Sequence, residues 1–205
     1  MIMSPNLGPA TMQRLIESVA DAVIGAADEL TALDQAIGDG DHGVNMKRGF
    51  EAIRGNAQAL SKKPVPDALK ALGTELVMKV GGASGPLYGT LFIGLGNAFA
   101  AGTDLSGAFA QAVEAVKARG KSQQGQKTML DVLVPVSAVL AVGGDALGRL
   151  PQLAAEAAEA TVPMQAVRGR ASFLGARSIG HMDPGARSAS LMIAAACRAL
   201  ESAHG

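Results

Sequence analysis

Apolar residues recur at helical spacing through most of the chain. Between residues 11 and 32, Leu15, Val19, Val23 and Leu30 fall on one helical face, and Thr11 is placed to cap the N-terminus. The same periodicity predicts about eight helices, over residues 11–32, 44–60, 67–80, 87–99, 106–119, 128–142, 152–167 and 185–203. No segment shows the strict apolar-polar alternation of a half-buried strand. The pattern predicts an all-α protein, an antiparallel up-and-down bundle.

Three glycine-rich polar stretches interrupt this pattern, at residues 34–45, 81–86 and 168–185. They follow the first, third and seventh predicted helices. In an up-and-down bundle, the loops after odd-numbered helices emerge at the same end. The three stretches can therefore build one site at one end of the bundle.

The first stretch has the composition of a metal site. Its chemistry comes from three aspartates and three glycines, namely Asp34, Asp39, Asp41, Gly38, Gly40 and Gly43. Glycines allow positive φ angles, so the carboxylates can converge on one point. Converging carboxylates repel one another unless a cation lies between them. The hard cations that suit such oxygens are Mg²⁺ and Ca²⁺, and Mg²⁺ often completes its shell with a substrate's phosphates. A metal-phosphate site is the leading interpretation.

Two known motifs match this stretch only superficially. Residues 38–43 fit the glycine spacing of a dinucleotide-binding turn, but no strand precedes them and the acids would repel a bare pyrophosphate. A calcium-binding loop that starts at Asp39 would need a glycine where Val44 stands and a glutamate where Phe50 stands. The remaining alternative is an acidic solvent loop that binds no ligand.

The second stretch could bind phosphate at the start of a helix. Ser84 is a candidate N-cap, Pro86 suits a first turn, and free backbone N–H groups there favour an anion. The Gly-Lys-Ser/Thr ending of a Walker loop is missing. A tight helix-helix connection without a ligand is the alternative. Further along, Lys127 could face a phosphate, although a loop lysine is usually only solvated.

The third stretch has too many glycines and too little periodicity for a helix, and ordered loops of this length are usually functional. It combines basic and acidic groups of the kind found around a polyphosphate, namely Arg168, Arg170, Arg177, His181 and Asp183. A hydrogen-bonded loop histidine is an equally good interpretation of His181. Asp183 precedes Pro184 and can also cap the last helix.

Composition excludes several classes of protein. At 205 residues the chain fits one domain, 1–205. Its 48% hydrophobic but only 3% aromatic content requires a core of Ala, Leu, Val, Ile and Met, and the many small side chains favour close packing of helices. Equal numbers of basic and acidic residues, 18 each, argue against nucleic acid as a partner. The single cysteine, Cys197, is expected in the core. There is no secretory signal, and the apolar run 132–142 is too short for a bilayer, so a cytoplasmic protein is expected.

Four ordered motifs together resemble the nucleotide-binding L subunits of dihydroxyacetone kinases, the DAK2 domain family. They read Gly-Asp-Gly-Asp-His-Gly at 38–43, Gly-Gly-Ala-Ser-Gly-Pro-Leu-Tyr-Gly at 81–89, Lys-Thr-Met at 127–129, and Gly-Arg-Ala-Ser at 169–172 followed by Gly-His-Met-Asp-Pro-Gly at 180–185. The resemblance runs from about Leu33 to the last helix. It implies an antiparallel eight-helix barrel with a nucleotide at one end.

The resemblance also implies roles for individual residues. Asp34, Asp39 and Asp41 would hold two Mg²⁺ ions that bridge the phosphates of ADP or ATP. The nucleotide contacts would come from His42, Gly43, Val44, Asn45, Ala83, Ser84, Gly120, Met129, Arg170, Asp183, Pro184 and Gly185. No catalytic residue is assigned, although Arg170 could stabilise charge. The chain departs from the family pattern at Gln126, Phe173, Ala176 and Met182, where the family often has Asp, Tyr, Glu and Gln.

By the same resemblance, the chain is one part of a kinase. A separate K subunit would hold dihydroxyacetone, and the bound ADP would be rephosphorylated by a phosphocarrier subunit of the phosphotransferase system, with phosphoenolpyruvate as the ultimate donor. The alternatives are an ATP-dependent kinase subunit for a tetrose such as erythrulose, or a nucleotide-loaded regulatory module that binds a transcription factor. A homodimer is also compatible with the family. No nucleic acid or membrane partner is expected.

Overall fold

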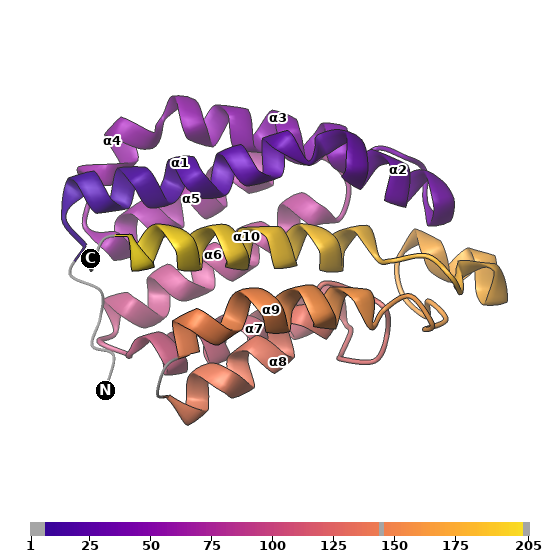
Figure 1. Ribbon diagram of the computed structural model, residues 1–205. Coiled ribbons are helices and arrows are strands. Elements are labelled where there is room, and N and C mark those ends of the chain that lie inside the picture. Colours follow the sequence, from indigo (N-terminus) through magenta and orange to yellow (C-terminus); the bar gives the residue numbers. More distant parts are fainter. Residues whose placement is uncertain (1–6, 144–145, 203–205) are drawn as a thin grey trace.

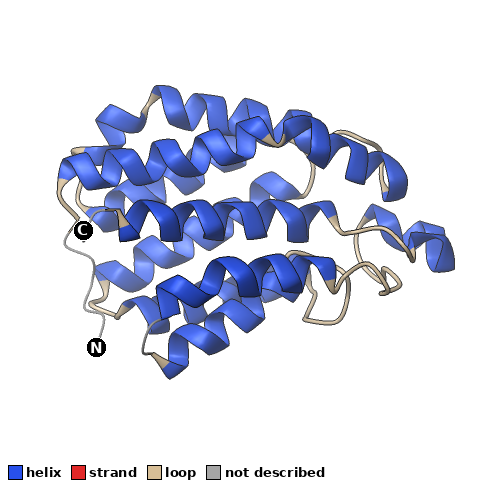
Figure 2. Ribbon diagram, viewed as in Figure 1, coloured by secondary structure: helices blue, strands red, loops and turns tan. Residues whose placement is uncertain are grey.

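The computed structural model describes residues 7–143 and 146–202, which are mostly helical and contain no strand (Figure 2). The elements are α1 (Pro9–Gly25), α2 (Ala27–Ile37), α3 (His42–Gly55), α4 (Ala57–Ser61), α5 (Val65–Lys79), α6 (Ser84–Ala100), α7 (Leu105–Gly120), α8 (Leu130–Val142), α9 (Ala146–Glu159), the 3₁₀-helix η1 (Arg170–Ser178) and α10 (Pro184–Glu201). The predicted all-α class is confirmed.

The long helices form a closed ring (Figure 1). From α3 through α5, α6, α7, α8 and α9 to α10, each helix packs against the next, and α10 packs against α1, which packs against α3. The short helices α2 and α4 extend α1 and α3 at opposite ends of the molecule. The connections α2–α3, α5–α6, α7–α8 and α9–α10 all lie at the right-hand end in Figure 1.

The helices outnumber the prediction because two predicted helices are broken. Ala26, at φ −95° and ψ 9°, separates α1 from α2, and Asn56, at φ −99° and ψ 3°, separates α3 from α4. Each break follows a glycine, Gly25 or Gly55, whose backbone is poorly suited to a helix interior. Apolar periodicity continues across both breaks, so the sequence pattern alone does not show them.

Several predicted helix ends are wrong. The first helix begins at Pro9 with Gly8 as its N-cap, so Thr11 lies inside the first turn and does not cap it. The ninth helix begins at Ala146, runs through Pro151 and ends at Glu159, whereas 152–167 was predicted. A proline removes one hydrogen bond but need not end a helix that packs well. The last helix ends at Glu201; residue 203, its predicted end, lies outside the described residues.

Small residues let the helices approach closely, as the composition predicts. A Cβ added to Gly73 or Gly89 would lie 2.8 Å from the other residue's carbonyl oxygen, and one on Gly96 would lie 2.6 Å from that of Pro66. These contacts join α5 to α6. Cys197 is buried in the core, where burial raises the pKa of its thiol to about 11. It therefore behaves as a small core residue.

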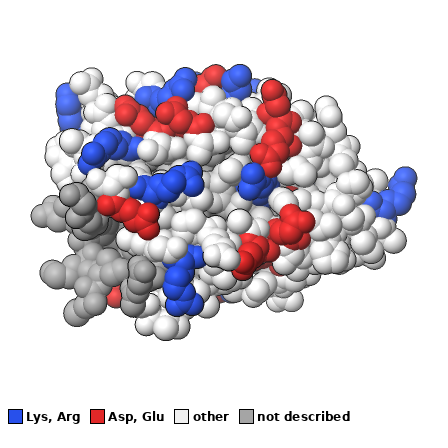
Figure 3. Space-filling view, viewed as in Figure 1, with Lys and Arg blue, Asp and Glu red and all other residues white. Residues whose placement is uncertain are grey.

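The face of the molecule drawn in Figure 3 shows no dominant charge. On the face drawn in Figure 3, acidic and basic side chains are interspersed over the helices, and neither sign forms a continuous patch. Within the described part of the chain, no helix is long and apolar enough to cross a membrane.

Candidate functional site

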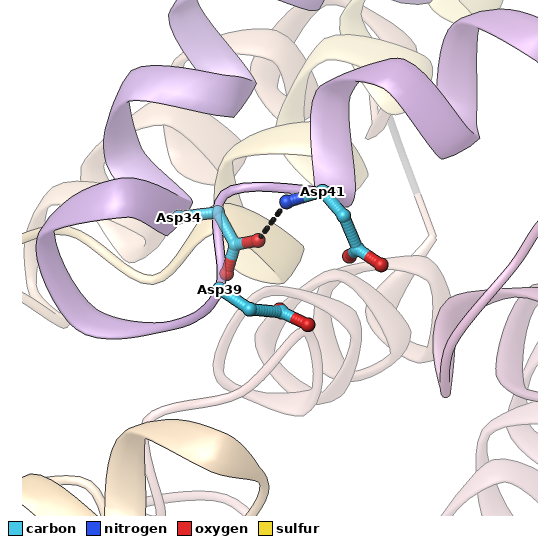
Figure 4. Close-up of side chains that lie close together, drawn as sticks. All are labelled: Asp34, Asp39 and Asp41. Atoms are coloured by element: carbon cyan, nitrogen blue, oxygen red, sulfur yellow. Dashed lines mark hydrogen bonds between the residues drawn. The ribbon is translucent and has the colours of Figure 1, made fainter.

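Three carboxylates meet where α2 gives way to α3 (Figure 4). Asp34 lies in the last turn of α2, Asp39 lies in the connection, and Asp41 is the residue before α3. One carboxylate oxygen from each lies within 4.8 Å of the others. Asp34 is buried, whereas Asp39 and Asp41 are more accessible. The cluster is thus fixed at its inner end and open at its outer end.

Backbone N–H groups at the start of α3 hold Asp34 in place. The Asp34 Oδ2 atom accepts hydrogen bonds from the backbone N–H groups of Asp41 at 2.9 Å and His42 at 3.1 Å. These are among the N–H groups that lack partners within the helix, and they favour negative charge. These two bonds fix the position of the buried carboxylate at the start of α3.

The glycines act differently from the prediction of three positive φ angles. Only Gly40 among them has one, at 75°. Gly38 is required because a Cβ would lie 2.1 Å from the Asp34 Oδ1 atom. Gly43 lies inside α3, where a Cβ would lie 1.9 Å from the carbonyl oxygen of Ala27 in α2. Two of the three glycines therefore serve close packing.

The carboxylates border a cavity of about 500 Å³ at this end of the ring. Its lining comes from four connections, the three glycine-rich stretches and the segment between α7 and α8, as helix parity predicts. Of the residues predicted to contact a nucleotide, the cavity is lined by His42, Asn45, Ala83, Ser84, Gly120, Met129, Arg170, Asp183, Pro184 and Gly185. It also includes Tyr88, Arg119 and Thr128, to which the sequence pattern assigned no role.

Two predicted nucleotide contacts lie elsewhere. Gly43 is buried between α2 and α3, and Val44 is exposed on the surface of α3. Neither lines the cavity. Both follow His42 on α3, and successive helical residues point in different directions, so a contiguous motif need not place all its side chains in one site.

The second stretch forms a turn whose serine has another role than capping. Helix α6 begins at Ser84 itself, with Ala83 at the N-cap position and no side-chain cap. The Ser84 Oγ atom lies 3.0 Å from Nδ1 of His42. A Cβ on Gly81 would lie 2.7 Å from Oδ1 of Asn45, so this glycine lets the turn close over α3. The second stretch thereby contacts the first one through His42 and Asn45.

Behind His42 lies a buried polar chain that sequence reasoning missed. The other ring nitrogen, Nε2, lies 3.0 Å from Oγ of Ser188, which lies 2.7 Å from the hydroxyl of Tyr88. Burial lowers the pKa of His42, while Asp34 and Asp41 oppose that shift. Burial also raises the pKa of Tyr88. Tyr88 falls within a family motif, but nothing in the sequence marks Ser188.

The third stretch is more ordered than predicted, since η1 occupies Arg170–Ser178 with a kink at Gly175, where φ is 56°. Arg170 forms an ion pair with Asp39, with 3.1 Å between its Nη2 and the Asp39 Oδ2. Arg168 also lines the cavity, whereas Arg177 and His181 are exposed and do not. The prediction that all of these groups surround one polyphosphate is therefore wrong for Arg177 and His181.

Lys127 lines the cavity but is not solvated, since its ammonium group is turned to backbone carbonyls. Its side chain is buried, and its ammonium donates hydrogen bonds to the carbonyl oxygens of Thr161 at 2.8 Å, Met164 at 3.1 Å and His181. Burial lowers its pKa, while Asp183 and Asp131 oppose the shift. The lysine fastens the segments before and after η1 to the loop that precedes α8.

Asp183 caps the last helix, as predicted. Its Oδ2 atom accepts a hydrogen bond from the backbone N–H of Ala186 at 2.7 Å. Burial nevertheless raises the pKa of Asp183 to about 7, and Asp131 and Asp34 add to this shift, while Ala186 and Lys127 oppose it. The carboxyl therefore combines a structural bond with a place in the cavity wall.

Comparison with known proteins connects this site to one family. The DAK2 domain profile matches residues 36–198. The ADP-binding subunit DhaL of a PEP-dependent dihydroxyacetone kinase from Escherichia coli K12 is 43% identical over 179 residues, which cover 82% of this chain and 85% of that subunit. A corresponding DhaL subunit from Listeria innocua is also 43% identical, over 80% of this chain and 82% of its own length.

A solved structure shows the same fold. The dihydroxyacetone kinase of C. freundii, in complex with AMP-PNP and Mg²⁺, superposes with a TM-score of 0.77 at 24% identity. The match covers 95% of this chain but 34% of that longer chain. The ring of helices is therefore also found as one portion of a larger polypeptide.

Proposed function

Because the chain belongs to the DAK2 domain family, we propose that it is the ADP-binding subunit of a phosphoenolpyruvate-dependent dihydroxyacetone kinase. The helical ring acts as one nucleotide-binding domain. The observation that carries the proposal is the acidic cluster of Asp34, Asp39 and Asp41 at the edge of a cavity of about 500 Å³, a volume suited to a small-molecule ligand.

The side chains present fit magnesium. All three carboxylates offer oxygen ligands, which Mg²⁺ prefers, and two backbone N–H groups hold the Asp34 carboxylate in position. Asp34, Asp39 and Asp41 would hold two Mg²⁺ ions, which supply charge neutralisation for the phosphates. The more accessible Asp39 and Asp41 leave room for phosphate oxygens and water to complete the coordination.

The other walls of the cavity suit a nucleotide. Ala83 and Ser84 lie at the start of α6, where backbone N–H groups favour phosphate. Gly120, Met129 and residues 183–185 line the remaining wall. Arg170 forms an ion pair with Asp39, and its guanidinium would stabilise negative charge on the transferred phosphoryl group. Phosphoryl transfer requires positioning and charge stabilisation more than covalent catalysis.

The sugar would be held by a partner. A separate K subunit would present the hydroxyl of dihydroxyacetone to the nucleotide end, and a phosphotransferase-system phosphocarrier would rephosphorylate the bound ADP. The relatives from Escherichia coli and Listeria innocua are named as PEP-dependent, which favours this donor over exchangeable ATP. The donor is tested by combining the chain and a K subunit with either ATP or the phosphocarrier system, and measuring phosphorylated dihydroxyacetone.

The nucleotide itself is tested on the protein as purified. Denaturation followed by chromatography should release about one ADP per chain, and prior treatment with EDTA should remove it, since the metal links nucleotide to protein. The Asp39→Ala variant should be isolated without ADP, whereas Glu51→Ala, an exposed acid elsewhere on α3, should retain it. A purified protein that neither carries ADP nor binds Mg-ADP would refute the proposed function.

A further inference from the structure

The polar chain behind His42 is closed off from solvent. Ser188 is 0% exposed and Tyr88 is 1% exposed, so they can satisfy their hydroxyl groups only with one another and with their protein neighbours. The Ser188 Oγ atom has three partners, which are Nε2 of His42 at 3.0 Å, the hydroxyl of Tyr88 at 2.7 Å and the carbonyl oxygen of Gly185 at 3.1 Å. The Tyr88 hydroxyl also lies 3.0 Å from that carbonyl.

The supply of hydrogens decides the direction of these bonds. A hydroxyl has one hydrogen to donate and can accept two, while a carbonyl can only accept. If Nε2 carries a hydrogen, it donates to Ser188, and the two hydroxyls can still form two further bonds with each other and with Gly185. If Nε2 is bare, Ser188 must donate to it, and only one other bond can form. The Nε2–H tautomer therefore satisfies one more buried bond.

This choice fixes the other side of the ring. In a neutral imidazole with Nε2 protonated, Nδ1 is an acceptor. Ser84 lies 3.0 Å from Nδ1, so it must donate its one hydroxyl hydrogen to the ring. The Ser84 oxygen, which lines the cavity, then offers only lone pairs to a ligand.

We propose that Ser188 is a positioning residue, which holds His42 as its Nε2–H tautomer and thereby turns the Ser84 hydroxyl into an acceptor toward the metal side of the nucleotide. This inference rests on the proposed function in taking the ligand to be Mg-ADP. Ser84 then accepts from a water bound to Mg²⁺, or contacts the ion itself, instead of donating to a phosphate oxygen. The phosphate receives its hydrogen bonds from backbone N–H groups.

The tautomer can be measured on the protein without nucleotide. Long-range ¹H–¹⁵N correlation spectra of histidine-labelled protein at pH 8 distinguish a protonated ring nitrogen from a bare one, and a His42→Gln variant identifies the His42 signals. The wild type should show protonated Nε2 and bare Nδ1. Ser188→Ala should abolish this preference. Protonated Nδ1 in the wild type, or an unchanged spectrum in Ser188→Ala, would overturn the proposal.

Two matched variants separate this role from loosening of the core. Tyr88→Phe removes a hydroxyl from the same chain, but Ser188 can still accept from Nε2 and donate to Gly185, so the tautomer should stay. Ser190→Ala removes another buried serine of α10, one whose hydroxyl donates to the carbonyl oxygen of Arg187, and should also leave the tautomer unchanged. Loss of the preference in all three variants would contradict a specific role for Ser188.

The link to Ser84 is tested by a double-mutant cycle. At a fixed ADP concentration, Ser188→Ala should raise the Mg²⁺ concentration for half-saturation roughly fivefold, the loss expected for one hydrogen bond. Ser84→Ala should raise it at least as much, and the double variant no further than Ser84→Ala alone. If the double variant instead raised this Mg²⁺ concentration by the product of the two single effects, Ser188 would not act through Ser84. If the wild type bound no Mg-ADP, the proposed function would fail, whereas the tautomer would still be decided by the spectra.

Discussion

At the scale of single residues, Lys127 shows how a buried charge can be satisfied without an acidic partner in contact. Its ammonium donates to backbone carbonyls of the turn after α9 and of the segment before α10. Its own backbone is left-handed, with φ at 60°, an unfavourable conformation for a residue other than glycine. The fold thus accepts local backbone strain at a position where one side chain connects three segments.

Replacing this lysine should be costly. Lys127→Met keeps much of the side-chain volume but leaves several buried carbonyls without a donor, so we expect the free energy of unfolding to fall by about 3 kcal/mol. Urea denaturation measures the change. Lys47→Met, at an exposed position of α3, should change it by less than about 0.5 kcal/mol. Equal effects at the two positions would show that the carbonyl contacts contribute nothing.

Asp183 should give stability a distinct dependence on pH. Between its ordinary pKa of 3.8 and its raised value of about 7, the folded chain keeps a proton that the unfolded chain releases. The contribution of this group to the free energy of unfolding therefore falls as pH rises through that window. Asp183→Asn retains a capping oxygen but cannot titrate. In EDTA, the free energy of unfolding of this variant relative to wild type should increase from pH 4 to pH 8. A difference between the two proteins that stays constant over this range would exclude the raised pKa.

At the scale of elements, the crossing of α2 over α3 positions the acidic cluster. Asp34 belongs to one helix, Asp41 precedes the other, and Gly43 allows the two backbones to touch. The spacing of the aspartates along the chain was enough to predict that their carboxylates converge. The sequence did not show that Asp34 lies in a helix. The carboxylates converge because two helices pack together, and not through the loop alone.

Gly43→Ala tests this crossing. The added Cβ would lie 1.9 Å from the Ala27 carbonyl oxygen and 2.3 Å from Oγ1 of Thr31, so the helices must separate. We expect a loss of about 2 kcal/mol in the free energy of unfolding, together with weaker Mg-ADP binding because Asp34 moves away from Asp41. The control is Gly55→Ala in the same helix, where the added Cβ has no atom within 4 Å. This variant should increase the free energy of unfolding by about 0.5 kcal/mol. Unchanged Mg-ADP binding in Gly43→Ala would contradict the role given to this crossing.

The sequence predicts elements better than their ends. Long apolar periodicity identified the helices of the ring, but it also continued across Ala26 and Asn56, where the backbone leaves the helical region. The helix predicted to start at residue 152 instead starts at Ala146, with Pro151 in its interior. The role of Lys127 was missed because its partners are backbone carbonyls of residues 161–164 and 181, which no side-chain pattern can indicate.

At the scale of the whole molecule, closure of the ring brings four connections from distant parts of the sequence to one end. Helix parity predicts this convergence, since it depends only on the number and order of the helices. It does not predict which side chains enter the cavity. Val44, Arg177 and His181 lie within family motifs or candidate stretches and yet point elsewhere.

A ligand that touches four connections should stabilise the fold as a unit. Mg-ADP at about 100 times its dissociation constant adds about 2.7 kcal/mol to the free energy of unfolding, which corresponds to a rise of roughly 5–10 °C in Tm for a domain of this size. Calorimetry should show this rise with Mg-ADP and lose it on addition of EDTA. If the rise in Tm persisted after EDTA was added, the nucleotide would be bound without metal.

The same closure has a consequence for any longer polypeptide that contains this ring. Because α1 and α10 are antiparallel neighbours, the start of α1 and the end of α10 lie together, at the end away from the cavity (Figure 1). A tether leaving α10 must travel back along the 18 residues of that helix, about 27 Å, before it can deliver another domain to the nucleotide. Even fully extended, such a tether needs about eight residues. With a shorter covalent connection, a domain tethered there would have to reach the nucleotide end of a different molecule.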